Sequence, residues 1–343
     1  MRGGAGVKQP AIPALAVALV LALPAFAQQP KSDLRPTQAP AAGNAAKPST
    51  PSGAFNAKPA DLPGFTEAND PFAAYQRGFY ATAFQLALKR VEANKTDSAA
   101  MTLLGQLYRE GAGAPRDPKE AARWFRIAAD LGDANAAFAY GVALLKGDGA
   151  PLDRAAAQKE FLRAAEKGHA EALYNLGVMA IEDSPGAPDF KKATDYFLRG
   201  AAAGSADSAY SLGVLYHNGR GVDHNDVEAS NWFKQAAEAE NVPGMVEYAI
   251  MLFNGEGVVK DEAAAARWFL KAAQRNNPVA QNRAARLLAA GRGVQTNLVE
   301  AMKWHLLARN AGIQDEWLDG RLTELTASQR ATVEEAVKKF SGG

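Results

Sequence analysis

The chain has 343 residues, and its 38 Lys and Arg residues are balanced by 37 Asp and Glu residues, so its overall charge favours neither a nucleic acid nor an anionic membrane as partner. It contains no cysteine, which excludes disulfides, thiolate metal sites, a cysteine nucleophile and a lipidated N-terminal cysteine. Frequent alanine and scarce runs of β-branched residues favour helices over sheets.

Residues 1–27 have the features of an export signal. Arg2 and Lys8 precede an apolar run at 14–23, and Ala25 and Ala27 fit the A-x-A cleavage rule. The apolar run of ten residues is too short to cross a hydrocarbon core of about 30 Å. We therefore predict cleavage after Ala27 and a periplasmic or secreted protein; the alternative is an uncleaved N-terminal anchor.

Residues 28–65 follow as a segment rich in proline and alanine. Seven prolines stand there among Ala, Ser, Thr, Gln and Lys. Such a composition cannot bury enough apolar area to offset the entropy of ordering the chain. The sequence predicts a disordered tether.

The segment LGVLYHNGRGV at 212–222 predicts a helix that ends at Gly219, and similar segments recur at intervals of 36 residues. A strict period of this length is typical of a solenoid of helix pairs. The segment at 176–186 keeps the length but lacks the glycine pair, and it differs at Asp183 and Pro185. The first glycines of the pairs are Gly111, Gly147, Gly219, Gly255 and Gly291, and the second are Gly113, Gly149, Gly221, Gly257 and Gly293. A phosphate-binding loop is disfavoured, because no G-K-[ST] follows the glycines and no strand is predicted before them.

Other columns with the same spacing indicate a second helix in each unit. A polar column predicts the N-caps of these helices: Asp117, Asp153, Asp189, Asn225, Asp261 and Asn297. Eight residues after each cap stands an apolar column that predicts one buried face: Phe125, Phe161, Phe197, Phe233 and Phe269, with His305 in the sixth place. Glu120, Glu228 and Glu300 lie three residues after their caps, which predicts reciprocal capping boxes.

The segment AYSLGVLYHNGRGVDHNDVEASNWFKQAA at 209–237 resembles the Sel1-like repeat, a variant of the tetratricopeptide helix hairpin. The resemblance implies an all-α fold, a right-handed α-solenoid of 36-residue helix-turn-helix units. Six units are predicted at 99–312, the last of which departs from the pattern at Ala284, Ala285 and His305. Residues 70–98 are predicted to form a tetratricopeptide-like N-terminal capping hairpin and residues 313–343 C-terminal capping helices, with a capping box at Thr326 and Gln329.

The resemblance implies an adaptor or regulator that binds a protein or peptide partner on the concave face, which the first helices line. Residues spaced i, i+4 and i+7 form an apolar stripe in the middle four units: Phe138, Val142 and Leu145; Tyr174, Val178 and Ile181; Tyr210, Val214 and His217; Val246, Ile250 and Phe253. The outer units carry Thr102, Gln106, Arg109, Asn282, Arg286 and Ala289 in the same places. Asn175 and Ser211, with Glu182 and Asn218, are candidates to bind a peptide backbone. Packing between successive first helices is the alternative role for the stripe.

Metal, cofactor and catalytic roles are not predicted. The four histidines contain no H-x-x-x-H pair, and His224 has only Asp223 and Asp226 beside it. The motifs S-x-x-K and K-T-G are absent, and Ser211 lacks the preceding strand of a nucleophile elbow. The sequence therefore favours an exported interaction scaffold or regulator without enzymatic activity; the alternative is an envelope-associated glycan-binding module or hydrolase that uses the same groove.

Overall fold

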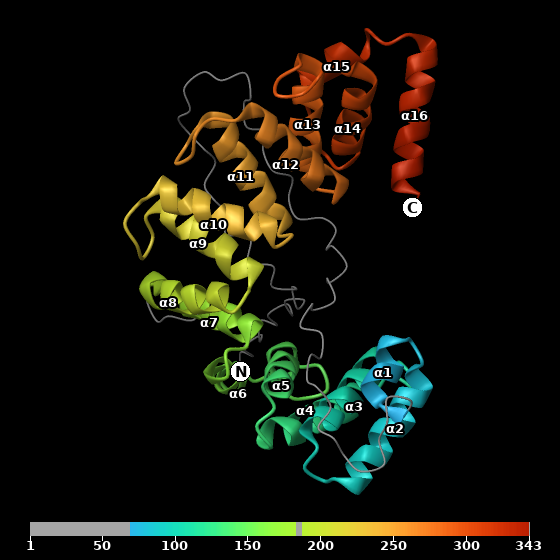
Figure 1. The fold of residues 1–343 in the computed structure, drawn as a ribbon, viewed down its shortest axis with the longest axis vertical. Coiled ribbons are helices and arrows are strands. Elements are labelled where there is room, and N and C mark those ends of the chain that lie inside the picture. Colours follow the sequence, from blue (N-terminus) through green and yellow to red (C-terminus); the bar gives the residue numbers. More distant parts are fainter. Residues whose placement is uncertain (1–68, 183–186, 343) are drawn as a thin grey trace, which may run out of the picture.

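The computed structural model describes residues 69–182 and 187–342, and these ranges contain sixteen α-helices and no strand. Figure 1 shows the helices stacked in chain order in a bowed array, with α1 and α2 at one end and α16 at the other. Helices pack mainly against their neighbours in the chain. The prediction of an α-solenoid is confirmed. In the described ranges, no helix has the length and apolar character needed to cross a membrane.

Six helix pairs with a constant spacing of 36 residues make up most of the array. The first helices of the pairs are α3 (Ser98–Glu110), α5 (Ala134–Lys146), α7 (Ala170–Glu182), α9 (Ala206–Asn218), α11 (Val242–Asn254) and α13 (Pro278–Ala290). The second helices are α4 (Pro118–Asp130), α6 (Arg154–Glu166), α8 (Phe190–Ala202), α10 (Asp226–Glu238), α12 (Glu262–Gln274) and α14 (Leu298–Asn310). Before the pairs lie α1 (Pro71–Gln76) and α2 (Tyr80–Ala93), and after them α15 (Glu316–Leu322) and α16 (Ala327–Ser341).

Several predictions made from the sequence concern residues outside the described ranges. These are the signal peptide at 1–27, the tether at 28–65, and the departure from the repeat at Asp183 and Pro185. They stay predictions.

The helix ends lie where the sequence places them. Each of the six predicted Asp and Asn caps accepts a hydrogen bond from an amide in the first turn of its second helix. The first glycine of each pair ends its first helix in the left-handed conformation, with φ between 63° and 78°. Glycine adopts this conformation without the steric cost that a Cβ brings. The G-x-G motif therefore ends a helix.

The predicted capping boxes at Glu120, Glu228 and Glu300 are wrong, whereas the one at Thr326 and Gln329 is formed. A box needs a free amide on the cap residue. In all six units that amide donates to a carbonyl near the end of the preceding first helix, as Asp117 N does to Tyr108 O at 2.9 Å. Glu120 instead pairs with Arg123. The loop in each unit is thus tied back to the helix that it leaves.

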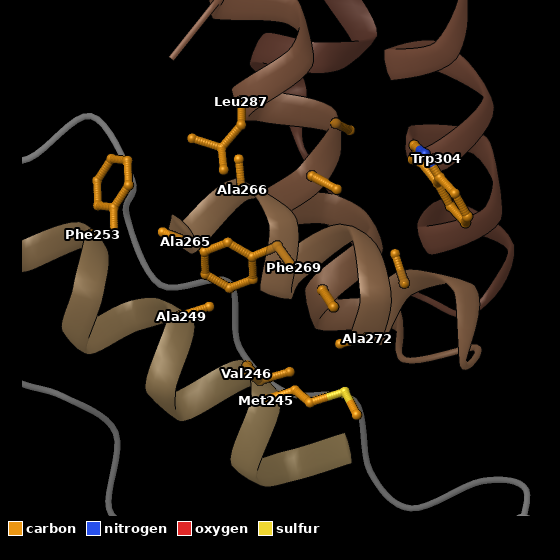
Figure 2. Close-up of a cluster of buried hydrophobic side chains, with 14 of the residues drawn as sticks. Met245, Val246, Ala249, Phe253, Ala265, Ala266, Phe269, Ala272, Leu287 and Trp304 are labelled. Atoms are coloured by element: carbon orange, nitrogen blue, oxygen red, sulfur yellow. The ribbon is translucent and has the colours of Figure 1, made fainter. Parts of the chain in front are cut away.

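A close contact between a glycine and a phenylalanine joins the two helices of a unit. A Cβ added at Gly105, Gly141, Gly177 or Gly213 would lie 2.4 to 2.7 Å from the Phe ring of the second helix, so only glycine permits this approach. The fifth unit has Ala249 instead, and Figure 2 shows the Phe269 ring of α12 facing Ala249 of α11. These phenylalanines are at most 3% exposed and form the centre of each unit's core.

The second glycine of each pair joins consecutive units, a role that the sequence did not reveal. A Cβ at Gly149 would lie 1.8 Å from the carbonyl oxygen of Pro118, the first residue of α4. The same contact recurs at Gly257 with Asp226 O at 1.9 Å and at Gly293 with Glu262 O at 2.0 Å. Each second glycine thus lies against the backbone at the start of the preceding unit's second helix.

We expect Gly149→Ala to destabilise the protein far more than Gly168→Ala. Both glycines have positive φ, but an alanine Cβ at Gly168 would meet no atom within 4 Å. Gly168→Ala should therefore cost only the left-handed strain of about 1–2 kcal/mol. Gly149→Ala should cost about 2–3 kcal/mol more, because the added Cβ would overlap the Pro118 carbonyl and force the first and second units to move apart or to strain. Urea unfolding followed by circular dichroism measures both; equal losses would contradict the inter-unit contact.

Candidate functional site

The predicted partner-binding residues lie along one side of four first helices, and we call them the stripe. On each helix the three positions i, i+4 and i+7 share one face. Eight members are half-buried: Phe138, Val142, Leu145, Tyr174, Ile181, Tyr210, His217 and Ile250. Four are buried: Val178, Val214, Val246 and Phe253. The half-buried members are available to a partner, whereas the buried ones pack between helices.

Three aromatic members of the stripe have the same setting in successive units. The rings of Phe138, Tyr174 and Tyr210 lie with centroids 5.8 to 5.9 Å from Phe161, Phe197 and Phe233, respectively. Each ring therefore contacts its unit's core phenylalanine while remaining partly exposed. Rings held in this way lose little conformational entropy when a partner binds, because the core already restricts them.

The tyrosine hydroxyls lie among carboxylates. Burial raises the pKa of Tyr174 to about 12, and Asp207 and Glu182 add to the rise. Burial also raises the pKa of Tyr210, with further contributions from Glu247 and then from Tyr174. Both phenols therefore keep their protons and can donate hydrogen bonds at neutral pH.

Phe253 differs from the other aromatic members, since it is only 3% exposed. The guanidinium of Arg292 lies 4.4 Å from its ring centroid and the Lys260 ammonium 5.8 Å from it. Arg292 also donates to Glu262 at 2.6 Å, which holds the guanidinium over the ring. A partner could contact Phe253 only after these cations move.

The polar neighbours of the stripe already have partners within the protein, three of them in their own helices and Glu182 on the helix before. Asn175 Nδ2 donates to Glu171 O at 2.7 Å, and Ser211 Oγ donates to Asp207 O at 2.8 Å. Asn218 Nδ2 donates to Val214 O at 2.8 Å, and Glu182 binds Arg154 at 2.6 Å. Ser211 is a buried residue of α9, and its hydroxyl is packed inside the protein.

His217, the last member of the stripe on α9, forms part of a small cluster at the end of that helix. Its Nδ1 lies 2.8 Å from Asp226 Oδ1, and His224 Nε2 lies 3.4 Å from Asp226 Oδ2. Among the described residues, no group of three or more His, Cys, Asp or Glu side chains is arranged to hold a metal ion. The cluster joins the end of α9 to the start of α10.

The end units carry polar residues at the same positions, and these residues are already hydrogen-bonded or buried. Asn282 and Arg286 of α13 bind Asp315, the N-cap of α15, at 2.7 Å (Nδ2 to Oδ2) and 2.6 Å (Nε to Oδ2). At the other end Thr102 is buried, and Gln106 and Arg109 bond to each other. The role of Asp315 was not predicted from the sequence, although polar residues at the stripe positions of the sixth unit indicated a different contact there.

The comparisons with known proteins agree with this geometry. The Sel1 repeat profile matches residues 98–133, 134–169, 170–205, 206–241, 242–277 and 278–313. The chain belongs to the Sel1 repeat family. Sel1 repeat proteins are generally scaffolds for protein–protein interaction rather than enzymes.

Two solved Sel1 repeat structures are similar to this chain. One is c5321, a protective antigen present in uropathogenic Escherichia coli strains, with a TM-score of 0.65 and 23% identity over 80% of this chain and 61% of that chain. The other is a Sel1 repeat protein from Oxalobacter formigenes, with a TM-score of 0.61 and 25% identity over 71% of this chain and 97% of that chain. The chain thus spans less than two thirds of the c5321 structure. No curated protein matches it.

The first helices of these Sel1 repeats have their own column of N-caps, which the sequence analysis overlooked. Its members are Asp97, Asp133, His169, Ser205, Asn241 and Asn277. His169 is the unusual member: its Nδ1 accepts from Ala172 N at 3.3 Å, and its ring stacks on Phe138 with centroids 4.5 Å apart. This cap requires an unprotonated Nδ1, so the hydrogen bond at the start of α7 is lost when that nitrogen is protonated.

We expect His169→Asn to make stability less dependent on pH. Burial lowers the pKa of His169, only partly opposed by Glu171 and Asp133, so protons bind the unfolded state preferentially. The wild-type chain should therefore lose stability as the pH falls below about 6.5, the ordinary pKa of histidine. Asparagine supplies a cap worth about 1 kcal/mol that does not titrate. Melting temperatures at pH 7.5 and 5.5 compare the two proteins; equal losses would contradict the role of His169.

We expect Asp315→Ala to cost about 3 kcal/mol, because it leaves the half-buried Arg286 guanidinium without its carboxylate. Although burial raises the pKa of Asp315, hydrogen bonds from Arg286 and Asn282 outweigh it and leave the pKa lowered. The contribution is therefore present above about pH 4 and is lost on acidification. Asp148→Ala, which removes an exposed pair with Arg116 at 3.4 Å, serves as the control and should cost less than about 1 kcal/mol. Chemical unfolding at pH 7 measures both; similar costs would contradict the prediction.

Proposed function

We propose that this chain is an exported scaffold that binds a peptide segment of a protein partner along the half-buried part of the stripe. The observation that carries the proposal is the contrast between the units. The middle units leave Phe138, Tyr174 and Tyr210 partly exposed, whereas the sixth unit covers the same position with Asp315. Binding sites concentrate large, rigid aromatic side chains, which contribute much of the affinity.

The geometry favours binding over catalysis. Ser211, the side chain considered for nucleophilic chemistry, is 4% exposed, and its hydroxyl donates to Asp207 O. Export rests on the sequence alone, namely the basic start, the apolar run and the A-x-A site that ends at Ala27. Sequencing the N-terminus of the protein purified from its native host tests this part: the proposal requires a start at Gln28.

Photo-crosslinking in intact cells tests the binding face. A benzoylphenylalanine at Tyr210 should yield a discrete adduct with a protein, because this ring lies at the centre of the stripe. The matched control is Leu198 on the second helix α8, which is 36% exposed and outside the stripe. Adducts of equal yield from both sites would contradict the proposal. Retention on purified peptidoglycan without any protein adduct would instead favour the glycan-binding alternative.

Once the partner is known, we expect Tyr210→Ala to weaken its binding by about tenfold or more, as truncation of a central aromatic contact does. Titration calorimetry with the purified partner measures this effect. Tyr140→Ala is the control, since Tyr140 is half-buried on α5 outside the stripe. An unchanged affinity of the Tyr210 variant would show that the partner binds elsewhere.

A further inference from the structure

Charge is distributed unequally between the two rows of helices in the middle of the array. The first helices α7, α9 and α11 carry four acidic residues and no Lys or Arg: Glu171, Glu182, Asp207 and Glu247. The second helices α8, α10 and α12 carry six basic and five acidic residues. The fourth helix that holds the stripe, α5, carries one charged residue, Lys146, so the four helices together are acidic, although the whole chain has a formal charge of only +1.

The four carboxylates differ in their neighbours, and among the described residues only one of them has an ion-pair partner that is charged at neutral pH. Glu182 has an arginine partner, Arg154, at 2.6 Å. Glu171 lies 3.3 Å from the imidazole of His169. Burial raises the pKa of Glu247, and His217 and Arg283 only partly oppose this. Asp207 receives a hydrogen bond from the neutral amide of Asn241 at 2.7 Å.

Asp207 stands three residues before Tyr210 on α9, so the two side chains lie on neighbouring parts of one helix face. Its charge contributes to the raised pKa of Tyr174, and Tyr174 in turn contributes to that of Tyr210. Asp207 is in contact with solvent, yet surrounding protein partly desolvates its carboxylate and raises its pKa, and Glu171 adds to the rise. A cation placed here would relieve this cost, and the half-buried rings of Tyr174 and Tyr210 could add a cation–π attraction.

We propose that the partner segment is basic, and that one of its Lys or Arg residues lies against Tyr174 and Tyr210 with its charge balanced by Asp207. The inference rests on the proposed function and names the chemistry of the partner for that same face. Apolar side chains of the segment contact Val142, Ile181 and Ile250, while its cations face the acidic row. Charge complementarity selects this partner over an acidic or a neutral one.

Three fluorescein-labelled peptides of equal length test the inference with the full mature chain. All three carry leucine or tyrosine at the same spacing, and the remaining positions are lysine in the first, serine in the second and glutamate in the third. Fluorescence anisotropy at low salt should show the lysine peptide binding at least about tenfold more tightly than the serine peptide, and the glutamate peptide most weakly. Raising the salt concentration should reduce the preference, because salt screens exposed charges.

Asp207→Asn should weaken binding of the lysine peptide about three- to tenfold and leave the affinity for the serine peptide unchanged. The asparagine oxygen can still accept from Asn241, so the fold is preserved, and circular dichroism verifies this. Asp195→Asn on α8 is the control, since Asp195 is exposed on a second helix and should affect neither peptide.

Two results would overturn the inference. The first is equal affinity for the lysine and serine peptides, or a preference for glutamate. The second is absence of binding by all three peptides at low salt. The crosslink from Tyr210 tests the proposed function separately. A protein adduct whose crosslinked segment is neutral or acidic would support the binding face and would contradict the basic character of the partner.

Discussion

The structure depends on the contact between the second glycine of each G-x-G and the backbone of the preceding unit. At Gly149, Gly257 and Gly293 the space for a side chain is already filled by a carbonyl group of the unit before. Two units joined by a hydrogen bond between side chains could still shift relative to each other, whereas a close contact between two backbones does not allow such a shift. The contact therefore restricts the angle between the units that it joins, and these units stack into the bowed array of Figure 1.

The proposed binding face follows from this geometry. Because the first helices repeat in a fixed orientation, residues that are 36 apart in sequence form a continuous row, as Phe138, Tyr174 and Tyr210 do. Glycine on each of these helices lets the core phenylalanine approach closely, and the stripe ring rests on that phenylalanine. Core packing and the presentation of aromatic side chains are therefore two results of one arrangement.

Much of the fold could be predicted from the sequence, because its signals are local. A left-handed glycine ends a helix and an Asp or Asn begins one through contacts within a few residues, so Gly219 and Asn225 identify their own roles. The errors concern groups that are distant in sequence. Glu120 forms no capping box because the amide of Asp117 is taken by Tyr108 O, and the Asp315 contact joins residues 29 positions apart.

For the candidate site, the sequence predicts which residues share one helix face but not how exposed each of them is. The spacing i, i+4, i+7 identifies which side chains share a helix face, and it cannot say what a neighbouring unit places above them. Phe253 shows the difference, since Arg292 of the next unit's loop covers its ring. Val178 and Val214 are likewise buried by packing between helices. Exposure along a solenoid is set by side chains one repeat away, which no local pattern encodes.

The contact made by the second glycine recurs at the described junctions whose later unit carries the glycine pair, and it involves only adjacent units, so the length of the array is free to change in evolution. Duplication of a 36-residue unit that carries the pair would recreate the same contact at the new junction, whereas an insertion of another size within a pair would shift a glycine away from its carbonyl. Whole units can thus be gained or lost, and with them further aromatic positions on the row of first helices. Recombination, rather than point substitution, is the natural way for such a chain to fit partners of different lengths.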